Sequence, residues 1–205
     1  MLTEIRTGPI ITADGAFSPK RSDKSGAMVV QMAHGDYQEA VVRNNVFSAS
    51  NQASAVFTLF GTTTSTGFAL FNPTGSGKNL VLLNVGYVRA IAMTTNIEQL
   101  VLTGSSTLTH SSTTALTIVN NFIGGSGTSV AAAYSATTLS AAGTIRCMLQ
   151  APSVSATATV GIPPVIMWDV QGLFVLAPGS TLYLASGLTN TQDGMVSMIW
   201  EEVPA

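Results

Sequence analysis

The sequence predicts an all-β protein, an antiparallel jelly-roll-like β-sandwich with an extended N-terminal arm. Three observations lead to this fold class. Short apolar runs of strand length recur from residue 46 onward, clusters of Gly, Ser, Thr, Asn and Pro separate them, and helix signals are weak throughout. A chain of 205 residues is long enough to bury a sizeable core in one domain, or in one domain with an arm.

The N-terminal arm is predicted over residues 1–45. This segment holds five of the eight Lys and Arg residues, and turn-forming pairs such as Gly8-Pro9 and Ser25-Gly26 interrupt it too often for long elements. Such a segment is either a disordered tail or an extended strap that orders on contact with a partner. Both interpretations stay open, although Ile10 and Ile11 are apolar anchors that a purely solvating tail would lack.

The body is predicted over residues 46–205, where charged residues become rare. Its predicted strands are residues 53–60, 67–71, 79–93, 98–104, 115–123, 144–151, 158–162, 164–176, 181–186 and 195–203. Strands at this spacing, separated by turn residues, are typical of sandwiches and barrels. Residues 131–143 are too rich in Ser, Thr and Gly to predict a helix.

The body is organised around residues 68–93. Turn formers at residues 72–77 join the apolar run Phe68–Phe71 to a long apolar run over 79–93, which predicts a hairpin. The second run alternates with a period of two, and the side chains of one parity include Val81, Leu83, Val85 and Tyr87. A strand of this kind belongs in the middle of a sheet.

The same turn contains Gly75-Ser76-Gly77-Lys78, which is similar to part of a phosphate-binding loop. That motif needs a glycine five residues before its Gly-Lys pair, where Asn72 stands, and a hydroxyl after the lysine, where Asn79 stands. The motif also opens a helix, whereas residues 79–93 have strand parity. The sequence therefore argues against a nucleotide-binding site here.

The last predicted strand, residues 195–203, is apolar on both faces. Val196, Met198 and Trp200 share one parity, and further apolar residues have the other. Since a lone sandwich would leave one face of this strand in water, Val196, Met198 and Trp200 are the candidate residues for an oligomer interface.

The composition also predicts assembly. Hydrophobic residues make up 46% of the chain and charged residues only 9%, against about 25% charged residues in a typical soluble domain. The mean hydropathy is +0.39. Because charged surface keeps monomers apart, a chain of this kind is expected to hide its surplus apolar surface in a closed homo-oligomer, with a homotrimer as the preferred form.

Charge and motif content argue against several classes of function. A net charge of -2 with no basic run gives no footprint for nucleic acid or for an anionic membrane. Glu4 and Arg6 interrupt the first residues, so no signal peptide is expected, and no run reaches the roughly 18 apolar residues of a membrane helix. Cys147 is expected to be a small buried apolar residue, and His34 and His110 are too few for a metal centre. No cofactor is expected.

Three segments of the chain resemble small structural proteins of tailed bacteriophages. They are AHGDYQEAVVRNNVFSASNQA at residues 33–53, ALFNPTGSGKNLVLLNVGY at residues 69–87 and SMIWEEVP at residues 197–204. Some members of that group are jelly-roll decoration or cement proteins. The resemblance implies a non-enzymatic oligomer that binds the major capsid protein on the exterior of the virion and stabilises the head. It implies no catalytic residues and no small-molecule substrate.

In such a protein the arm would extend across capsomer boundaries. Its candidate capsid contacts are Ile10, Ile11, Lys20, Arg21 and Lys24. Each copy would add a modest contact area, and many copies on one lattice would together bind tightly. Deletion of residues 1–30 is expected to leave a folded trimer that no longer coats capsids.

Two other functions stay open. A fibre or receptor-binding module would expose aromatic residues to glycans, and the candidates are Tyr37, Tyr87, Tyr134, Trp168 and Trp200. The two tryptophans are instead expected in the core or an interface, because both lie inside apolar runs. An enzyme such as a hydrolase would gather carboxylates, and Asp169 is the one acid within an apolar run. A buried, hydrogen-bonded or interface-paired aspartate is the preferred interpretation of that residue.

Overall fold

The computed structural model describes residues 35–89, 99–106, 108–150, 165–187 and 193–205. The chain divides into two compact units, Met1–Glu39 and Ala40–Ala205, and every described strand belongs to the second. The predicted strand at residues 158–162 and most of the predicted arm lie outside the described residues.

The elements that the structure describes are one short helix and a series of strands. In chain order they are α1 (Gln38–Val42), β1 (Val46–Ser50), β2 (Ala55–Val56), β3 (Thr64–Phe71), β4 (Lys78–Arg89), β5 (Gln99–Ser105), β6 (His110–Ala115), β7 (Ile118–Asn120), β8 (Ala132–Leu139), β9 (Thr144–Gln150), β10 (Val165–Asp169), β11 (Val175–Leu176), β12 (Thr181–Ser186) and β13 (Asp193–Pro204).

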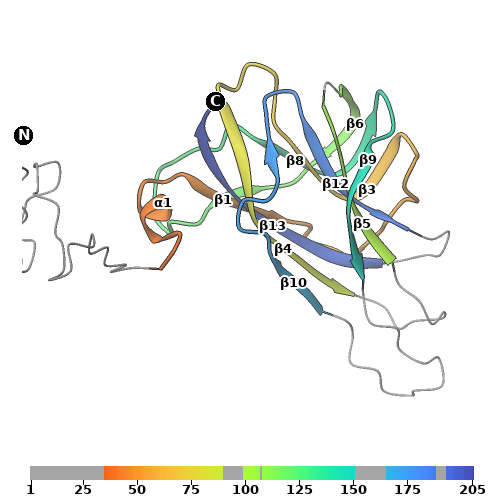
Figure 1. Cartoon of the computed structure of the whole chain (residues 1–205), viewed down its shortest axis with the longest axis horizontal. Coiled ribbons are helices and arrows are strands. Elements are labelled where there is room, and N and C mark those ends of the chain that lie inside the picture. Colours follow the sequence, from red (N-terminus) through yellow and green to blue (C-terminus); the bar gives the residue numbers. More distant parts are fainter. Residues whose placement is uncertain (1–34, 90–98, 107, 151–164, 188–192) are drawn as a thin grey trace, which may run out of the picture. The chain divides into compact units, whose positions relative to one another are not determined.

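The strands form two antiparallel sheets packed against each other (Figure 1). The seven-stranded sheet has the order β10-β4-β13-β1-β7, with β11 also paired to β4 and β2 to β13. The six-stranded sheet has the order β6-β8-β3-β12-β5-β9. The predicted all-β antiparallel sandwich is therefore confirmed.

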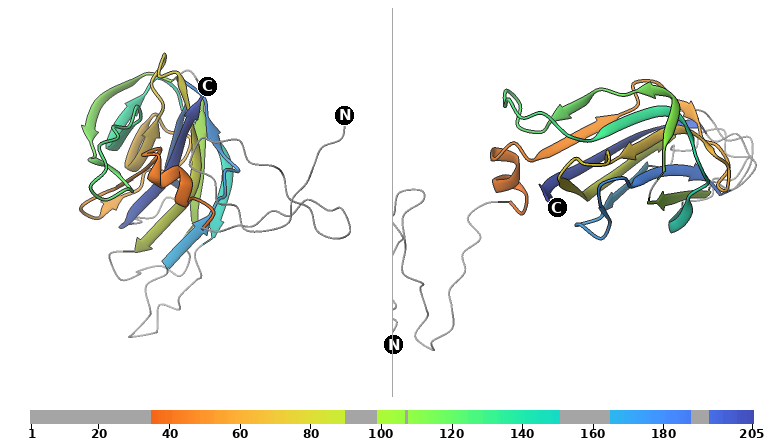
Figure 2. Two further views of the ribbon diagram at one scale, coloured as in Figure 1. Left: turned by 90° about the vertical axis from the view of Figure 1, so that its left-hand side faces the viewer. Right: turned by 90° about the horizontal axis from the view of Figure 1, so that it is seen from above.

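The strand pairs show how the chain is rolled up. β1 pairs with β13, β3 with β12, β4 with β10 and β5 with β9, so each pair is nested within the previous one along the chain. This pattern is one long antiparallel ribbon, and rolling it up brings β13 beside β4 and β12 beside β5. In both views of Figure 2 the dark blue β13 runs along the olive β4. A ribbon rolled into two sheets is the arrangement of a jelly roll.

Large apolar side chains fill the space between the sheets. The largest fully buried ones in this main core are Trp200, Tyr87, Phe47 and Phe68. Alternation along the strands places them there, since successive side chains of a strand point to opposite faces. In β12, for example, Leu182 and Leu184 join the main core while Tyr183 and Ala185 face the other way.

The predicted hairpin over residues 68–93 is wrong. β3 belongs to the six-stranded sheet and β4 to the seven-stranded sheet, so residues 72–77 cross between the sheets. The side-chain amide of Asn72 holds this crossover, donating to the carbonyl oxygens of Lys78 and Leu176, each at 2.8 Å. Turn residues signal a change of direction, but they do not determine which strands pair. The predicted central position of β4 is confirmed, because it lies between β10 and β13.

A β-bulge interrupts the alternation of β4. Ile199 of β13 lies opposite Asn84 and Trp200 lies opposite Leu82, so Leu83 is the extra residue. Before the bulge, even-numbered residues such as Leu82 face the main core, and after it odd-numbered residues such as Val85 do so. The single parity predicted for the whole run is therefore wrong before the bulge.

Candidate functional site

The three predicted interface residues lie inside the body. Val196, Met198 and Trp200 are all essentially inaccessible to solvent and belong to the main core. The shared parity predicted for them is correct, but they are wrong as candidates for a contact with another subunit. The face of β13 that carries Trp200 packs against the opposite sheet, because Trp200 belongs to one core cluster with Phe68 of β3 and Leu184 of β12.

The chain itself covers part of the outer face of the six-stranded sheet. Tyr183, Ala185 and Leu139 of this face join a second apolar cluster, which Leu108, between β5 and β6, covers. The hydroxyl of Tyr183 accepts a hydrogen bond from the Gly143 amide at 3.0 Å, and burial raises the pKa of this tyrosine. Leu108 and Gly143 thus cover part of this face, whereas Met148 of β9, on the same face, is exposed.

The outer face of the seven-stranded sheet carries exposed apolar side chains. Met195 of β13 lies opposite Val88 of β4, and Met167 of β10 lies opposite Gly86. The side chains of Val88, Met167 and Met195 are all exposed, and that of Met167 is 72% exposed. They border a shallow groove of about 240 Å³. We call this surface, made of Gly86, Val88, Met167, Met195 and Ser197, the methionine face.

Small residues shape the groove in the methionine face. A Cβ atom on Gly86 would lie 2.6 Å from the hydroxyl oxygen of Ser197 and 3.7 Å from the sulfur of Met167. Any side chain at Gly86 would therefore collide with Ser197 and fill the groove. Because glycine and serine are the residues present, the flexible methionines border an open apolar hollow.

Comparison with known proteins does not identify this chain. It matches no protein-family model, no curated protein and no solved structure. Its function must therefore be inferred from its fold and its surfaces.

His110 occupies a structural position on β6. Its Nδ1 lies 3.1 Å from the Thr137 hydroxyl and its Nε2 lies 2.7 Å from the Thr181 hydroxyl. The ring packs between Phe71 and Tyr134, with centroid distances of 4.3 and 5.3 Å. Burial lowers the pKa of His110 below its ordinary value of 6.5. Both ring nitrogens thus have threonine partners.

Cys147 does not pair with His110. The thiol points to the carbonyl oxygen of Met148 at 3.6 Å, and the half-buried side chain packs against the main core. Cys147 is predicted to be a small buried apolar residue; its packing on the main core agrees with the apolar role, but the side chain is half-buried rather than buried. His34 lies outside the described residues. Within the described ranges, no group of three or more His, Cys, Asp or Glu residues could hold a metal ion.

Asp169 is exposed rather than buried. Its carboxylate accepts a hydrogen bond from the Gln171 side chain at 2.8 Å, so the predicted hydrogen bond is present and the predicted burial is wrong. Its neighbour Trp168 packs edge to face on Phe174 with a centroid distance of 5.7 Å. As predicted, both tryptophans contribute to packing, Trp168 at the margin of the main core and Trp200 within it. Of the other glycan candidates, Tyr87 lies in the main core and Tyr134 packs on the second cluster.

The candidate capsid contacts Ile10, Ile11, Lys20, Arg21 and Lys24 lie outside the described residues. In the part of the chain that the structure describes, no helix is long and apolar enough to cross a membrane.

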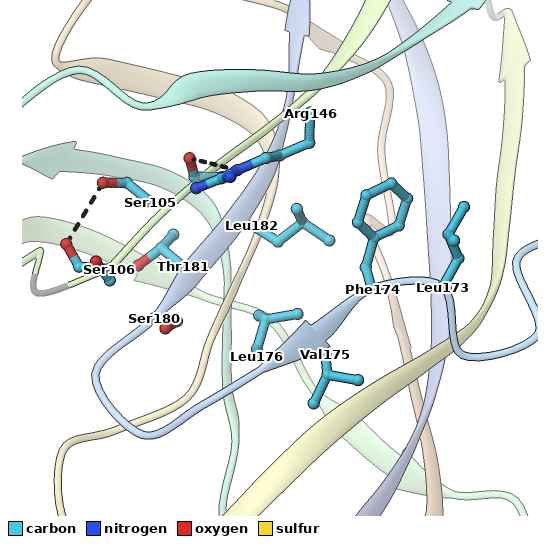
Figure 3. Close-up of a pocket in the computed structure, with 11 residues that line it drawn as sticks. Ser105, Ser106, Arg146, Leu173, Phe174, Val175, Leu176, Ser180, Thr181 and Leu182 are labelled. Atoms are coloured by element: carbon cyan, nitrogen blue, oxygen red, sulfur yellow. Dashed lines mark hydrogen bonds between the residues drawn. The ribbon is translucent and has the colours of Figure 1, made fainter.

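A second hollow, of about 330 Å³, lies between the two sheets beside β11 (Figure 3). Its walls are residues 104–106 at the end of β5, residues 173–176 around β11, residues 180–182 at the start of β12, and Arg146 of β9. We call it the Arg146 pocket. In Figure 3 the guanidinium group lies toward Ser105, whereas Leu173 and Phe174 lie on the other side.

Sequence reasoning missed both surfaces. Met195 has the parity opposite to that of the candidate interface residues, and nothing in the sequence shows which parity points outward. Arg146 is the only Lys or Arg in residues 90–205, and a lone cation within an apolar run is the signal that would have drawn attention to it.

Proposed function

We propose that this chain is a non-enzymatic structural protein of a phage virion. It binds the exterior of the major capsid lattice as a homo-oligomer and stabilises the head. The observation that carries the proposal is the contrast between the two outer faces of the body. The chain covers part of the outer face of the six-stranded sheet, where Met148 is exposed by itself among the described residues, while on the outer face of the seven-stranded sheet exposed side chains from three strands surround the groove of the methionine face.

The methionine face is suited to contact with identical copies. Scattered exposed apolar residues are ordinary, but here exposed side chains from β4, β10 and β13 lie side by side around one groove. A chain with only 9% charged residues has little charge repulsion to keep copies apart. Burial of these side chains in a closed oligomer, proposed as a trimer, removes them from water.

The resemblance of three segments to structural proteins of tailed phages supports the virion part of the proposal. Two of these segments include strands of the methionine face, since residues 69–87 contain most of β4 and residues 197–204 contain the end of β13. A jelly-roll body is also suited to the role, because it provides a rigid unit that presents an outer sheet face to neighbouring subunits.

Self-association is tested by Met167→Glu, with Met148→Glu as the matched control. Both methionines are exposed to a similar degree, 72% and 75%, but Met148 lies on β9 of the other sheet. In sedimentation velocity the wild-type chain and Met148→Glu should be oligomeric, whereas Met167→Glu should be monomeric with an unchanged circular dichroism spectrum. A monomeric wild-type chain would refute self-association, and an oligomeric Met167→Glu would refute this interface.

Capsid binding is tested by cosedimentation with capsids assembled without this protein. The full chain should pellet with them, and a chain lacking residues 1–30 should remain oligomeric in the supernatant. A full chain that stays in the supernatant would refute the capsid role without affecting the self-association result. Pelleting of the truncated chain would refute the role of the arm.

A further inference from the structure

We propose that the Arg146 pocket is a binding site for a monocarboxylate carried on an apolar group. This inference does not depend on the proposed virion role, because it rests on a different surface and a different chemistry. The carboxylate would be held by the guanidinium of Arg146, and the apolar group would lie against Leu173 and Val175.

The guanidinium group of Arg146 has N–H donors available for a ligand. Its Nε donates to the carbonyl oxygen of Gly104 at 3.3 Å, and within the described residues its other N–H groups have no hydrogen-bond partner. A guanidinium presents its N–H groups as a planar fork that matches the two oxygens of a carboxylate. The bond to Gly104 fixes the orientation of this fork and leaves its outer N–H groups for a ligand.

A β-bulge aims Arg146 into the pocket. Leu102 lies opposite Cys147 and Thr103 lies opposite Ile145, so Arg146 is the extra residue in β9. Cys147 accordingly packs on the main core and Ile145 on the second cluster, although an unbroken strand would turn both to the same face. Bulges are common next to binding sites, where they redirect a side chain.

Gly104 gives the arginine room to lie across β5. A Cβ atom on Gly104 would lie 3.3 Å from Cγ of Arg146 and 3.1 Å from a methyl carbon of Leu182. Both distances are tighter than ordinary packing, so a side chain at this position would push the arginine stem aside. The absence of a side chain at Gly104 therefore keeps the cation over the pocket.

The opposite wall selects an apolar group. Leu173 is 70% exposed and Val175 is 56% exposed, so a ligand that covers them would remove apolar surface from water. Arg146 is the single charged residue of the lining, which favours a ligand with one negative charge over a phosphate dianion. The volume of about 330 Å³ is near the lower end of the range for small-ligand sites, roughly 300–1,000 Å³.

Two sources could supply this chemistry. One is a free short-chain acid, and the other is an acidic side chain flanked by apolar residues on a neighbouring protein. Hexanoate serves as the probe for the first, and the peptide acetyl-Leu-Asp-Leu-amide serves as the probe for the second. Tighter binding of one probe identifies the source, and failure of both to bind would overturn the proposal.

The experiment is an NMR titration of the full chain, observing the Arg146 Nε–H signal and the methyl signals of Leu173 and Val175. Hexanoate should shift all three sets of signals and should bind on the order of tenfold more tightly than acetate, because it adds buried methylene groups. Hexan-1-ol should leave the Nε–H signal in place, and inorganic phosphate should bind more weakly than hexanoate. Equal binding of hexanoate and hexan-1-ol would show that the cation plays no part.

Three variants locate the site. Arg146→Gln should weaken hexanoate binding on the order of tenfold, and Arg146→Lys should give an intermediate affinity because it keeps the charge and loses the fork. Arg43→Gln removes the same charge outside the pocket and should bind hexanoate like the wild type. Wild-type affinity in Arg146→Gln would overturn the proposal. Sedimentation of the same samples reports separately on self-association, so the two proposals can fail independently.

Discussion

Lys78 and Glu202 form an ion pair that ties the beginning of β4 to the end of β13. The lysine Nζ lies 3.1 Å from Oε2 of the glutamate, whose side chain is fully buried, while the lysine is partly exposed. The other carboxylate oxygen accepts hydrogen bonds from the Ser129 hydroxyl and from the Val130 amide, the latter at 2.9 Å. One buried carboxylate therefore joins both sheets, through β4, β13 and the segment that leads into β8.

Removal of the two partners should have unequal effects on stability. Glu202→Ala leaves three donors without their acceptor and should lower the free energy of unfolding by about 3–5 kcal/mol. Lys78→Ala should cost only about 1–2 kcal/mol, since the carboxylate keeps two donors and water can replace the partly exposed ammonium. Urea unfolding of both variants measures the difference. Equal losses, or a larger loss for Lys78→Ala, would contradict this arrangement.

The orientation of β13 predicts unequal losses of unfolding free energy when Met198 and Met195 are truncated. Met198→Ala should lower the free energy of unfolding by about 2–5 kcal/mol, because it leaves a cavity in the main core. Met195→Ala should change it by less than about 0.5 kcal/mol, because that side chain is already exposed. Both are measured by urea unfolding in the Met167→Glu background, so that dissociation of an oligomer does not contribute. A large loss of unfolding free energy in Met195→Ala would show that this side chain lies inside the body.

Asn72 should be essential to the crossover between the sheets. Asn72→Ala removes the donor of one buried and one partly buried hydrogen bond and should cost about 2–3 kcal/mol of unfolding free energy. Ser76→Ala is the matched control, because the Ser76 hydroxyl donates to the same Lys78 carbonyl at 3.1 Å but lies in a more accessible turn. The control should lose no more than about 1 kcal/mol of unfolding free energy. Thermal denaturation of the two variants checks this order.

His110 should make stability depend on pH in a known direction. Burial lowers its pKa in the folded chain, so below the ordinary value of 6.5 the unfolded chain takes up the proton first. The stability that neutral His110 contributes is therefore complete above pH 6.5 and is lost as the pH falls through the pKa of the folded state. The side chains around the ring are Phe71, Tyr134, Thr137 and Thr181, and none carries a charge near neutral pH.

The measurement compares the wild-type chain with His110→Gln by urea unfolding from pH 8 to pH 5. The difference in unfolding free energy that favours the wild type should shrink toward pH 5, because only in the wild type does His110 take up a proton on unfolding. Carboxylates titrate alike in both chains and cancel in the difference. A difference that stays constant, or that grows toward acid, would show that His110 is not held in its neutral form.

The sequence predicts the fold class well because the apolar strands alternate visibly. β12 has a clear two-residue period, and its side chains lie where that alternation places them. β6 and β8 were not predicted, because their Ser, Thr and Ala residues lack an apolar period and they pair with each other at the margin of a sheet. A strand of small polar residues differs little from a loop in sequence alone.

The surfaces were harder to predict than the fold. β13 is apolar on both faces, so the alternation could not show that Trp200 points inward and Met195 outward. Which face of β13 points inward depends on how β13 pairs with β4 and β1, and those pairings join residues far apart in the chain. The orientation of Arg146 depends on a bulge, and an extra residue in one strand has no signature in the sequence.

The nested ribbon also constrains how the protein reaches its fold. β1 and β4 are not neighbours in the seven-stranded sheet, because β13 lies between them, and the hydrogen bond from the Val196 amide to Asn51 spans 145 positions. The sheet cannot close until nearly the whole body has been synthesised. Pairings of such long range fold slowly, and until then β1 and β4 have bare edges on which other nascent chains can aggregate. Chaperones that shield these edges during translation should therefore raise the soluble yield.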